Sequence, residues 1–546
     1  MPAQRHQPRP SPVGAPDTSV LVVGAGPTGL LLACALRRHG VDCVLVDAYD
    51  EPLGWDRATI VHPRSLQIFE SLGVVDQLLD AGVHVRGCRI HADGRLLAAP
   101  DYTANRTRYP FDIGLSEETT ERVLTDYLLL HGGAVTRSTR LVDLQQGEDR
   151  VTATLESGGQ QRSLTAAWVV GCDGYRSTVR TAAGIAFEET VPDSPWAVFD
   201  TGLENWSAEW DLVFAFFDDP LVILTPLPGR RFRVYLRPGS RTADLEATAL
   251  AVVGRYSPGV AFVDIRNPMR FLCHARVAER FRAGRVLLAG DAAHACSPTE
   301  GHEMNTGLQD AYNLGWKLAH VCQGEAGEAL LDSYEGERRP VAVRVVESGA
   351  ASDAAQSRLD EAERVARNAG VSAAFGDAES AHLEAVAAAE VDRDYSGSPI
   401  VVGRPAYEVD GVPAGRLVPV TAPVCPVDGP PRPLHELAHR LGHTVLVLGG
   451  PTTTPTEVAA VLDDLVAVPA LGFLESSFGF VVEDEAPDTS PQGLGTMRTE
   501  TADQLGVGRL SVLVVRPDRY VGLRWDDQDA AGVVAAVSGY VERLAT

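Results

Sequence analysis

The sequence lacks a long hydrophobic run. No stretch of its 546 residues approaches the ~20 consecutive apolar residues that a membrane-spanning helix requires. Residues 1–18 are rich in proline and have no apolar segment of the signal-peptide type, so we expect a disordered tail there. Positive charge is also scarce, and the formal net charge of −25 would repel nucleic acid and anionic membranes alike. We therefore expect a soluble, cytoplasmic protein with neither nucleic-acid nor membrane partners.

Cysteine is sparse and scattered. The eight cysteines form no C-x-x-C pair, so neither a structural zinc site nor a dithiol redox motif is indicated. His302 and Glu303 lie side by side, but the string HEMNT lacks the second histidine that a zinc helix carries four residues on, so we predict no metal. The chain also lacks a G-x-S-x-G nucleophile elbow, which argues against a hydrolase.

The N-terminal third begins with the pattern of a parallel βαβ unit. Residues 19–23 are a β-branched run that ends in GAGPTG, residues 29–40 have a helical pattern that Gly40 closes, and residues 43–46 form a second apolar run. Strand, glycine turn, helix and strand in this order predict a Rossmann-like α/β fold. A chain of this length exceeds the roughly 250 to 300 residues of a single core, so we expect further domains.

The glycine turn has the spacing of a dinucleotide-binding fingerprint. Gly24 would permit the tight turn, Gly26 would let the backbone approach a pyrophosphate, and Gly29 would let helix and strand pack closely. The helix N-terminus would then face the phosphates, and Asp47, after the second strand, would hydrogen-bond the ribose. Pro27 and Thr28 complete the fingerprint. By itself it fits NAD as well as FAD.

The later parts of the chain differ in texture. Residues 187–273 alternate aromatic and apolar residues around turn signals, which predicts an antiparallel β-sheet on the substrate side. We assign residues 19–186 and 274–395 to a discontinuous nucleotide-binding domain, with long helices from 308 to about 389. Residues 396–546 show a strand, a helix, a hairpin and a closing helix, the order of a thioredoxin-like domain. This part contains only Cys425, so we interpret it as a packing or dimerisation module without disulfide chemistry.

Two further motifs place an aspartate just after a predicted strand. Residues 169–180 read VVGCDGYRSTVR and carry Asp173, and residues 285–310 read RVLLAGDAAHACSPTEGHEMNTGLQD and carry Asp291. With the fingerprint, they resemble the three signature motifs of class A flavoprotein monooxygenases over about residues 19–345. The whole chain, including its C-terminal part, resembles the aromatic polyketide hydroxylases of actinomycete pathways. The resemblance implies FAD as the cofactor.

The resemblance also implies roles for individual residues. Asp291 would bind the ribityl chain, and Met304 and Asn305 would meet the flavin ring at a helix N-terminus, which suits the negative charge of reduced flavin. Arg57 would lie beside the cofactor and Arg122 near the pyrophosphate, although a surface salt bridge is the alternative for each. Asp173 would serve FAD and the nicotinamide cofactor, and could also cap the helix near Ser177. The remaining expected cofactor contacts are Glu117, Val142, Pro298 and Gly301.

Three acidic residues depart from the family pattern. The flavin loop of the family reads Pro-x-Gly-Gly-x-Gly, whereas here Glu300 and Glu303 replace two of its glycines, and Glu117 stands where the family has a glutamine. Side chains at such positions would displace the loop, and carboxylates near the ring would oppose an anionic reduced flavin. The alternative is that the glutamates point to solvent.

Two functions therefore stay open. The first is an NADPH- or NADH-dependent monooxygenase that hydroxylates an aromatic or polyketide small molecule in bacterial natural-product biosynthesis. The second is a redox-silent FAD-containing cyclase of the (4+2) type, which would act by holding a flexible chain in a reactive conformation. No catalytic residue stands out, and a homodimer is possible on this pattern. Candidate pocket walls are Trp196, Phe214, Phe216 and Phe217, although core packing explains most of them as well.

Overall fold

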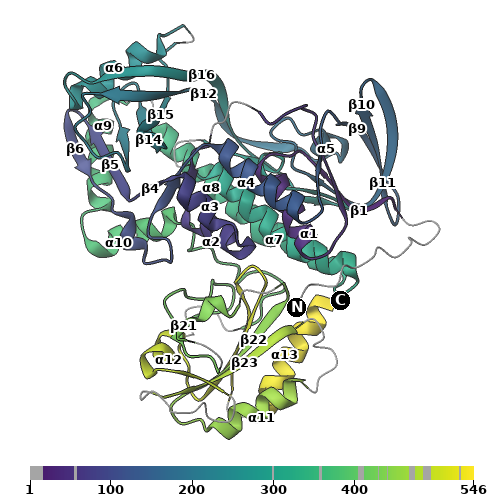
Figure 1. Ribbon diagram of the computed structural model, residues 1–546. Coiled ribbons are helices and arrows are strands. Elements are labelled where there is room, and N and C mark those ends of the chain that lie inside the picture. Colours follow the sequence, from purple (N-terminus) through teal and green to yellow (C-terminus); the bar gives the residue numbers. More distant parts are fainter. Residues whose placement is uncertain are drawn as a thin grey trace.

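The computed structural model describes residues 16–53, 58–240, 242–297, 301–355, 359–403, 411–427, 430–438, 441–466, 474–483, 494–527 and 530–545. The chain folds into a large body and a smaller C-terminal body, which lies below it in Figure 1. Most of the predicted N-terminal tail falls outside the described residues. Among the helices that the structure describes, none combines the length and apolarity needed to cross a membrane.

The predicted βαβ unit is confirmed at the centre of the large body. β1 (Thr18–Val23) is followed by α1 (Pro27–Arg38) and by β2 (Cys43–Val46), and β1 pairs with β2 in parallel. The sheet continues in the order β17-β18-β11-β1-β2-β8, and β9 and β10 extend it antiparallel from β11. Its other strands are β8 (Val135–Thr136), β9 (Arg140–Gln146), β10 (Val151–Ser157), β11 (Gln160–Gly171), β17 (Arg282–Ala283) and β18 (Val286–Leu288).

The parallel pairing brings three motifs to one edge. β11 pairs in parallel with both β1 and β18, so the carboxyl ends of all three strands meet there. The backbone N–H of Cys172 donates to the carbonyl of Val23 at 2.7 Å, and that of Ala289 donates to Gly171 at 2.9 Å. Residues from 24, 172 and 290 onward therefore lie together, although more than 100 residues separate the motifs.

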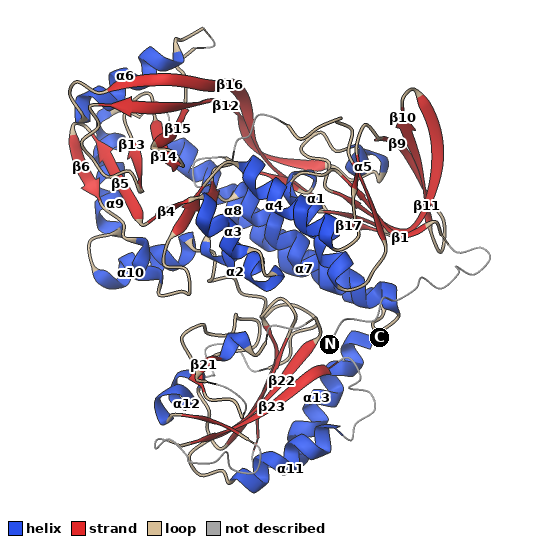
Figure 2. Ribbon diagram, viewed as in Figure 1, coloured by secondary structure: helices blue, strands red, loops and turns tan. Residues whose placement is uncertain are grey.

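Helices cover the sheet and form the middle layer seen in Figure 2. The long α7 (Glu303–Gln323) packs against α1, and its predicted buried face is confirmed because Leu308, Ala311, Leu314 and Leu318 are all 0% exposed. The other helices of the large body are α2 (Pro63–Leu72), α3 (Val75–Ala81), α4 (Glu117–Leu130), α5 (Thr178–Ala182), α6 (Leu245–Tyr256), α8 (Asp332–Ala355), α9 (Glu361–Ala374) and α10 (Ala378–Ala388).

The predicted substrate-side sheet exists but extends beyond residues 187–273. Its strand order is β19-β16-β12-β15-β14-β13-β5-β6. The strands β5 (Gly87–Ala92) and β6 (Arg95–Ala98) come from the segment assigned to the nucleotide-binding domain, and β5 pairs in parallel with β13 (Leu212–Phe216). Such long-range pairing has no local signal. The other strands are β12 (Phe187–Glu204), β14 (Val222–Leu227), β15 (Arg231–Leu236), β16 (Ala261–Ala278) and β19 (His294–Ala295).

A small sheet bridges the two large ones. β7 (Asp112–Gly114) lies between β3 (Ile60–Val61) and β4 (Val83–Val85), and both neighbours pair with it antiparallel. β3 leads directly into α2, whose first residue is Pro63. The junction between β3 and α2 therefore lies between the nucleotide-binding sheet and the substrate-side sheet.

The C-terminal body is a five-stranded sheet with helices on it. β22 (His443–Gly449) lies at the centre, parallel to β23 (Leu474–Val482) and antiparallel to β25 (Leu510–Val515), which pairs with β26 (Val521–Asp527). The short β24 (Gly495–Met497) forms the other edge. The helices are α11 (Pro455–Val466), α12 (Thr499–Leu505) and α13 (Ala530–Ala545), so the predicted strand, helix, hairpin and closing helix are all present.

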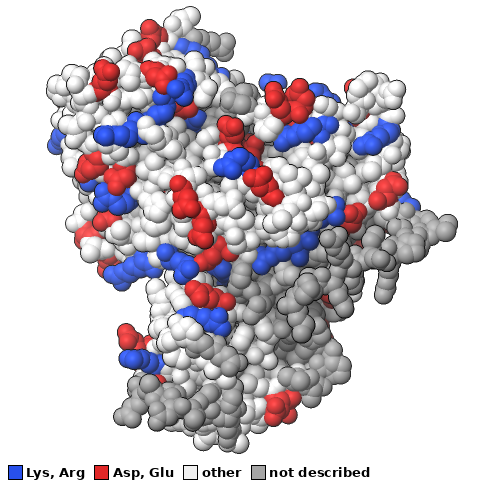
Figure 3. Space-filling view, viewed as in Figure 1, with Lys and Arg blue, Asp and Glu red and all other residues white. Residues whose placement is uncertain are grey.

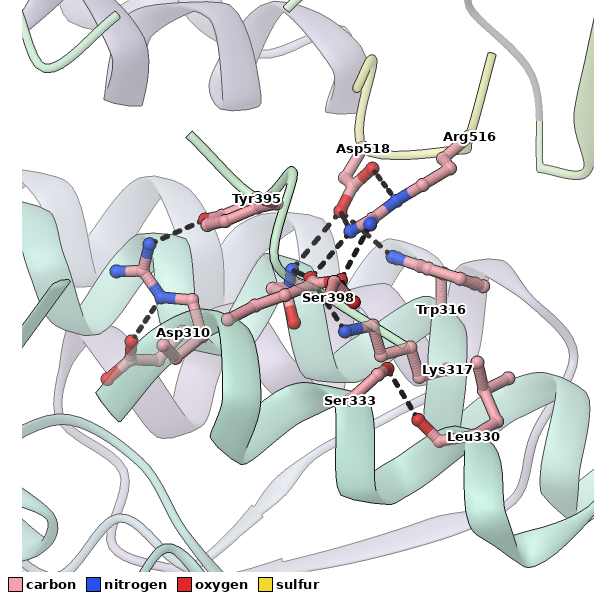
Figure 4. Close-up of polar contacts among 12 residues, drawn as sticks. Asp310, Trp316, Lys317, Leu330, Ser333, Tyr395, Ser398, Arg516 and Asp518 are labelled. Carbon is pink, nitrogen blue, oxygen red and sulfur yellow. Dashed lines mark hydrogen bonds and ion pairs between the residues drawn. The ribbon is translucent and has the colours of Figure 1, made fainter. Parts of the chain in front are cut away.

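A buried polar network fastens the two bodies together. Glu337 of α8 accepts hydrogen bonds from Arg516 and from Lys317, and Asp518 accepts from Arg516 and from the Trp316 indole. Figure 4 shows Trp316 and Lys317 of α7 converging with Arg516 and Asp518 of the β25–β26 turn. Two carboxylates and two cations balance, which a water-excluded site requires. On the face shown in Figure 3, acidic and basic side chains are interspersed rather than gathered in one patch.

Candidate active site

A cavity of about 880 Å³ connects the carboxyl edge of the parallel sheet with the substrate-side sheet. One end is formed by the glycine turn and by the motifs that follow β11 and β18. The other end is formed by strands β5, β13, β14 and β15 and by helices α8, α9 and α10. The residues at the first end are Gly26, Pro27, Thr28, Glu117, Cys172, Gly174, Asp291, Gly301, Glu303 and Met304.

The three fingerprint glycines are required for different reasons. Gly24 has a φ of +101°, and a Cβ there would lie 2.3 Å from the carbonyl oxygen of Cys172. A Cβ on Gly29 would lie 1.9 Å from the carbonyl oxygen of Gly24, so these two glycines are required by the turn itself. A Cβ on Gly26 would have only the Glu121 carboxylate nearby, at 3.9 Å, and Gly26 lines the cavity. The bare backbone of Gly26 and the N-terminus of α1 thus form a cradle that fits a pyrophosphate.

Asp47 braces the turn from the end of β2. Its carboxylate accepts from the backbone N–H of Ala25 at 2.7 Å and from that of Tyr49 at 2.9 Å. It is 9% exposed, and Arg137 lies 3.7 Å away. The predicted hydrogen bond to a ribose remains a prediction.

The two motif aspartates are placed differently. The Asp173 carboxylate accepts from the N–H groups of Thr178 and Val179 and from the Ser177 hydroxyl, which is the expected capping role at α5. Burial raises the pKa of Asp173, and these hydrogen bonds only partly oppose it. Asp291 lies in a single turn after β18, next to the glycine turn, and lines the cavity. Of the two, Asp291 is the one positioned to contact a ligand.

The start of α7 closes this end of the cavity. Met304 lines it as expected, whereas Asn305 is 0% exposed and does not belong to the lining. The Asn305 side chain accepts from the backbone N–H of His62 at 3.0 Å. It donates to the backbone carbonyls of Ile60 and Gly301 at 2.9 and 3.0 Å. It therefore ties the β3–α2 junction to the loop before α7. Pro298 and Glu300 fall outside the described residues.

Two of the three acidic departures, Glu117 and Glu303, lie on the cavity wall. Both are engaged with the backbone. Glu117 accepts from the N–H of Ala58 at 3.2 Å, and Glu303 accepts from that of Cys296 at 3.4 Å. These hydrogen bonds from backbone N–H groups stabilise part of the negative charge of each carboxylate.

Two other expected contacts, Arg122 and Val142, are not brought together with the cavity. Arg122 lies on α4, is 60% exposed and forms an ion pair with Asp126 at 3.8 Å, which is the surface alternative. Val142 lies on β9 and is 39% exposed. Among the described residues, neither lines the cavity. Arg57 falls outside the described residues.

The face that the substrate-side sheet turns to the cavity is mostly apolar. Phe217 lines the cavity as expected, but Phe214, Phe216 and Trp196 are buried in the cores around it. The sheet presents instead Cys88, Ile90, Val213, Ala215, Ile223, Thr225 and Tyr235. The Tyr235 hydroxyl is 2.9 Å from that of Thr59, so the polar tip of the tyrosine is engaged. The helices on the other side of this end contribute charged residues, among them Arg344, Arg367 and Glu384. The mostly apolar face of the sheet suits a ring-shaped organic substrate.

Two histidine–carboxylate pairs were missed by the sequence analysis. His62 lies 3.2 Å from Asp112, and His302 lies 2.8 Å from Glu390. The two imidazole rings are 5.0 Å apart, and both line the cavity. The carboxylate partners lie 50 and 88 residues away in the chain, so no local pattern could have joined them.

A family model described as an FAD binding domain matches residues 17–349. The chain belongs to the class A flavoprotein monooxygenases. FAD is the cofactor of this family, and the cradle at Gly26 together with Asp291 fits it. The flavoprotein assignment was predicted from the same motifs that the structure brings to one edge.

Relatives cover the large body best. The chain is 37% identical over 347 residues to 6-methylpretetramide 4-monooxygenase of Streptomyces rimosus, a match that covers 62% of each chain. It is 37% identical over 354 residues to rifampicin monooxygenase of Streptomyces venezuelae, covering 60% of this chain and 70% of the relative. The match thus spans less than two thirds of the first of these relatives.

Likeness of structure extends over the whole chain. A crystal structure of aklavinone-11 hydroxylase in a ternary complex with FAD and aklavinone is 25% identical and has a TM-score of 0.73. The match covers 97% of this chain and 99% of that one. The C-terminal body is therefore part of the shared architecture.

Proposed function

We propose that the protein is an NAD(P)H-dependent FAD monooxygenase that hydroxylates an aromatic polyketide intermediate in a bacterial natural-product pathway. One observation carries the proposal: a single cavity runs from the pyrophosphate cradle at Gly26 to the apolar face of the substrate-side sheet. A cofactor held at one end and a ring system held at the other would share this space. The names of 6-methylpretetramide 4-monooxygenase and of aklavinone-11 hydroxylase support the substrate class.

Bound FAD would supply the oxygen-transfer chemistry, and the chain supplies position and environment. Gly26, Thr28 and Asp291 would hold the cofactor. The apolar residues that β13, β14 and β15 contribute would exclude water from the rings of a bound substrate, which would strengthen the electrostatic interactions inside. Glu117 and Glu303, engaged with backbone N–H groups, are compatible with a reducible flavin.

The finer domain description is also a proposal. We assign residues 19–186 and 274–395 to the FAD-binding domain and residues 187–273, extended by β5 and β6, to the substrate-side domain. Residues 396–546 form a thioredoxin-like module, supported by the strand order β23-β22-β25-β26 and by the parallel β22–β23 pair. With one cysteine, Cys425, it serves packing or homodimerisation. NADPH and NADH are both candidates for the reductant.

The test is an isotope experiment on the purified, FAD-loaded protein. Aklavinone and 6-methylpretetramide serve as probes under isotopically labelled oxygen gas, with NADPH, with NADH, or with neither. We expect a product that carries one labelled oxygen atom and forms only with a nicotinamide cofactor. An isomer of unchanged mass, formed without nicotinamide, would contradict the proposal and support the cyclase. Gly26→Val, which fills the cradle, is the matched control and should give no product.

A further inference from the structure

One buried histidine on the cavity wall has an unused nitrogen. His62 is 4% exposed and lines the cavity, and its Nε2 has no hydrogen-bond partner among the described residues. A buried polar atom without a partner costs free energy, so a site that keeps one calls for an explanation. A group on a bound ligand is the partner that the cavity offers.

His62 is held once at its backbone and once at its ring. The backbone N–H of His62 donates to the Asn305 side chain at 3.0 Å, and the imidazole Nδ1 lies 3.2 Å from a carboxylate oxygen of Asp112 on β7. A carboxylate accepts but does not donate, so Nδ1 carries the proton. In the neutral ring, Nε2 therefore keeps a lone pair that no described residue engages, on a residue that lines the cavity.

The position of Nε2 is close to the cofactor end. An ideal Cβ built on Gly301, in the loop that precedes α7, would lie 3.7 Å from this atom. Ile60, Ile223 and the Thr59–Tyr235 pair also line the cavity. Nε2 is thus a basic atom on a part of the wall that also carries His302 and Arg393, beside the loop that the family uses for the flavin.

The charges around His62 strengthen it as a base. Burial lowers the pKa of the imidazole, but the Asp112 charge and hydrogen bond, with the Glu390 charge, outweigh burial and leave the pKa raised. Arg393 opposes them, and His302 faces the ring from the start of α7.

We propose that His62 Nε2 accepts the hydroxyl proton of a phenol or enol on the bound substrate, with Asp112 as its positioning residue. The O–H bond breaks, an N–H bond forms, and the electron pair stays on oxygen, so no oxidant or reductant takes part. The products of the step are a phenolate and an imidazolium held by Asp112. A phenolate ring is richer in electrons than a phenol, which favours oxygen transfer to it. The inference rests on the proposed function and names the substrate class.

The experiment measures the ionisation of a bound phenol. 2-Hydroxyanthraquinone is the probe, because ionisation of its hydroxyl changes its absorbance, and its 2-methoxy counterpart is the control that cannot ionise. In the wild-type FAD-loaded protein, we expect the hydroxyl to ionise about 1 to 3 pH units lower than in water, the size of effect that a nearby opposite charge produces. His62→Gln should abolish this shift, and Asp112→Asn should remove part of it.

Controls separate this role from a structural one. His131→Asn, at the exposed end of α4, should leave the shift unchanged, and 2-methoxyanthraquinone should bind wild type and variants alike. A wild-type protein that produces no shift, or a His62→Gln variant that folds, holds FAD and keeps the full shift, would overturn the inference. Flavin reduction by NADPH in the same samples reports on the proposed function: reduction without a phenol shift refutes only the role of His62, and a phenol shift without reduction refutes only the monooxygenase.

Discussion

Replacing Glu337 by glutamine removes one negative charge from the buried network of Figure 4. It also puts an NH₂ group, which donates two hydrogen bonds, where a carboxylate oxygen accepted them. Its Oε2 accepts from Arg516 at 2.8 Å, from Lys317 at 2.8 Å and from Asn313 at 2.7 Å, and its Oε1 accepts from Arg516 and Ser398, both at 2.7 Å. A glutamine NH₂ group would face an Arg516 N–H in either orientation of the amide. At least one donor would therefore meet a donor.

The magnitude follows from burial. Glu337 is 2% exposed, and although burial raises its pKa, Arg516 and Lys317 outweigh burial and lower it strongly. The carboxylate is thus ionised, and its loss leaves the network with an uncompensated positive charge. Breaking a buried ion pair from one side costs about 3–5 kcal/mol. We expect Glu337→Gln to lower the free energy of unfolding by that amount.

The assay is equilibrium unfolding in urea, followed by circular dichroism, with Asp126→Asn as the matched control. Asp126 also forms an ion pair with an arginine, but the side chains of Asp126 and Arg122 are both 60% exposed. Asp126→Asn should therefore lower the free energy of unfolding by no more than about 0.5 kcal/mol. Proteolysis should also separate the two bodies more readily in Glu337→Gln, because the network joins α8 to the C-terminal sheet. A Glu337→Gln protein as stable as Asp126→Asn would refute the reasoning.

Three further predictions concern the cavity and its surroundings. Gly26→Val should lose FAD, measured as flavin absorbance after purification, at little cost in melting temperature, whereas Gly29→Ala should fail to fold stably because its Cβ would lie 1.9 Å from a carbonyl oxygen. Burial raises the pKa of Glu390, but His302 outweighs it and lowers the pKa to about 2. Because that folded value is depressed, Glu390 contributes stability above its ordinary value of 4.5 and loses it as pH falls toward 2, so Glu390→Gln should flatten this acid limb of the unfolding free energy. Arg122→Ala should leave FAD affinity, measured by fluorescence titration, unchanged; a large loss would restore the pyrophosphate role that the sequence indicated.

Much of the fold could be predicted because its signals are local. The run 19–23, the glycine turn and the helix that follows predict β1 and α1 within two residues, and the aspartates after β11 and β18 predict the ligand edge. The pairing of β5 with β13 joins segments more than 100 residues apart, and nothing in the short run 87–92 indicates it. Only the tertiary pairing with β13 shows that this run belongs to the substrate-side sheet.

The cofactor end of the site was predictable, and the reactive end was not. Gly24, Gly26 and Gly29 carry backbone requirements that a motif records. The His62–Asp112 pair depends on the β3–α2 junction and on β7, which come together only in the folded chain. The contact of Asn305 with the flavin through the start of its helix stays a prediction, and its side-chain amide holds the β3–α2 junction, which the sequence did not indicate.

The central claim is that this chain holds FAD in the cavity and reduces it in turnover. The most direct measurement mixes FAD-loaded protein with excess NADPH or NADH without oxygen, in the presence of aklavinone or 6-methylpretetramide, and follows the yellow absorbance of oxidised flavin. The account predicts that this colour is lost rapidly with at least one nicotinamide cofactor, despite Glu117 and Glu303 on the cavity wall. Flavin that stays oxidised with both cofactors, while either compound is converted, would contradict it.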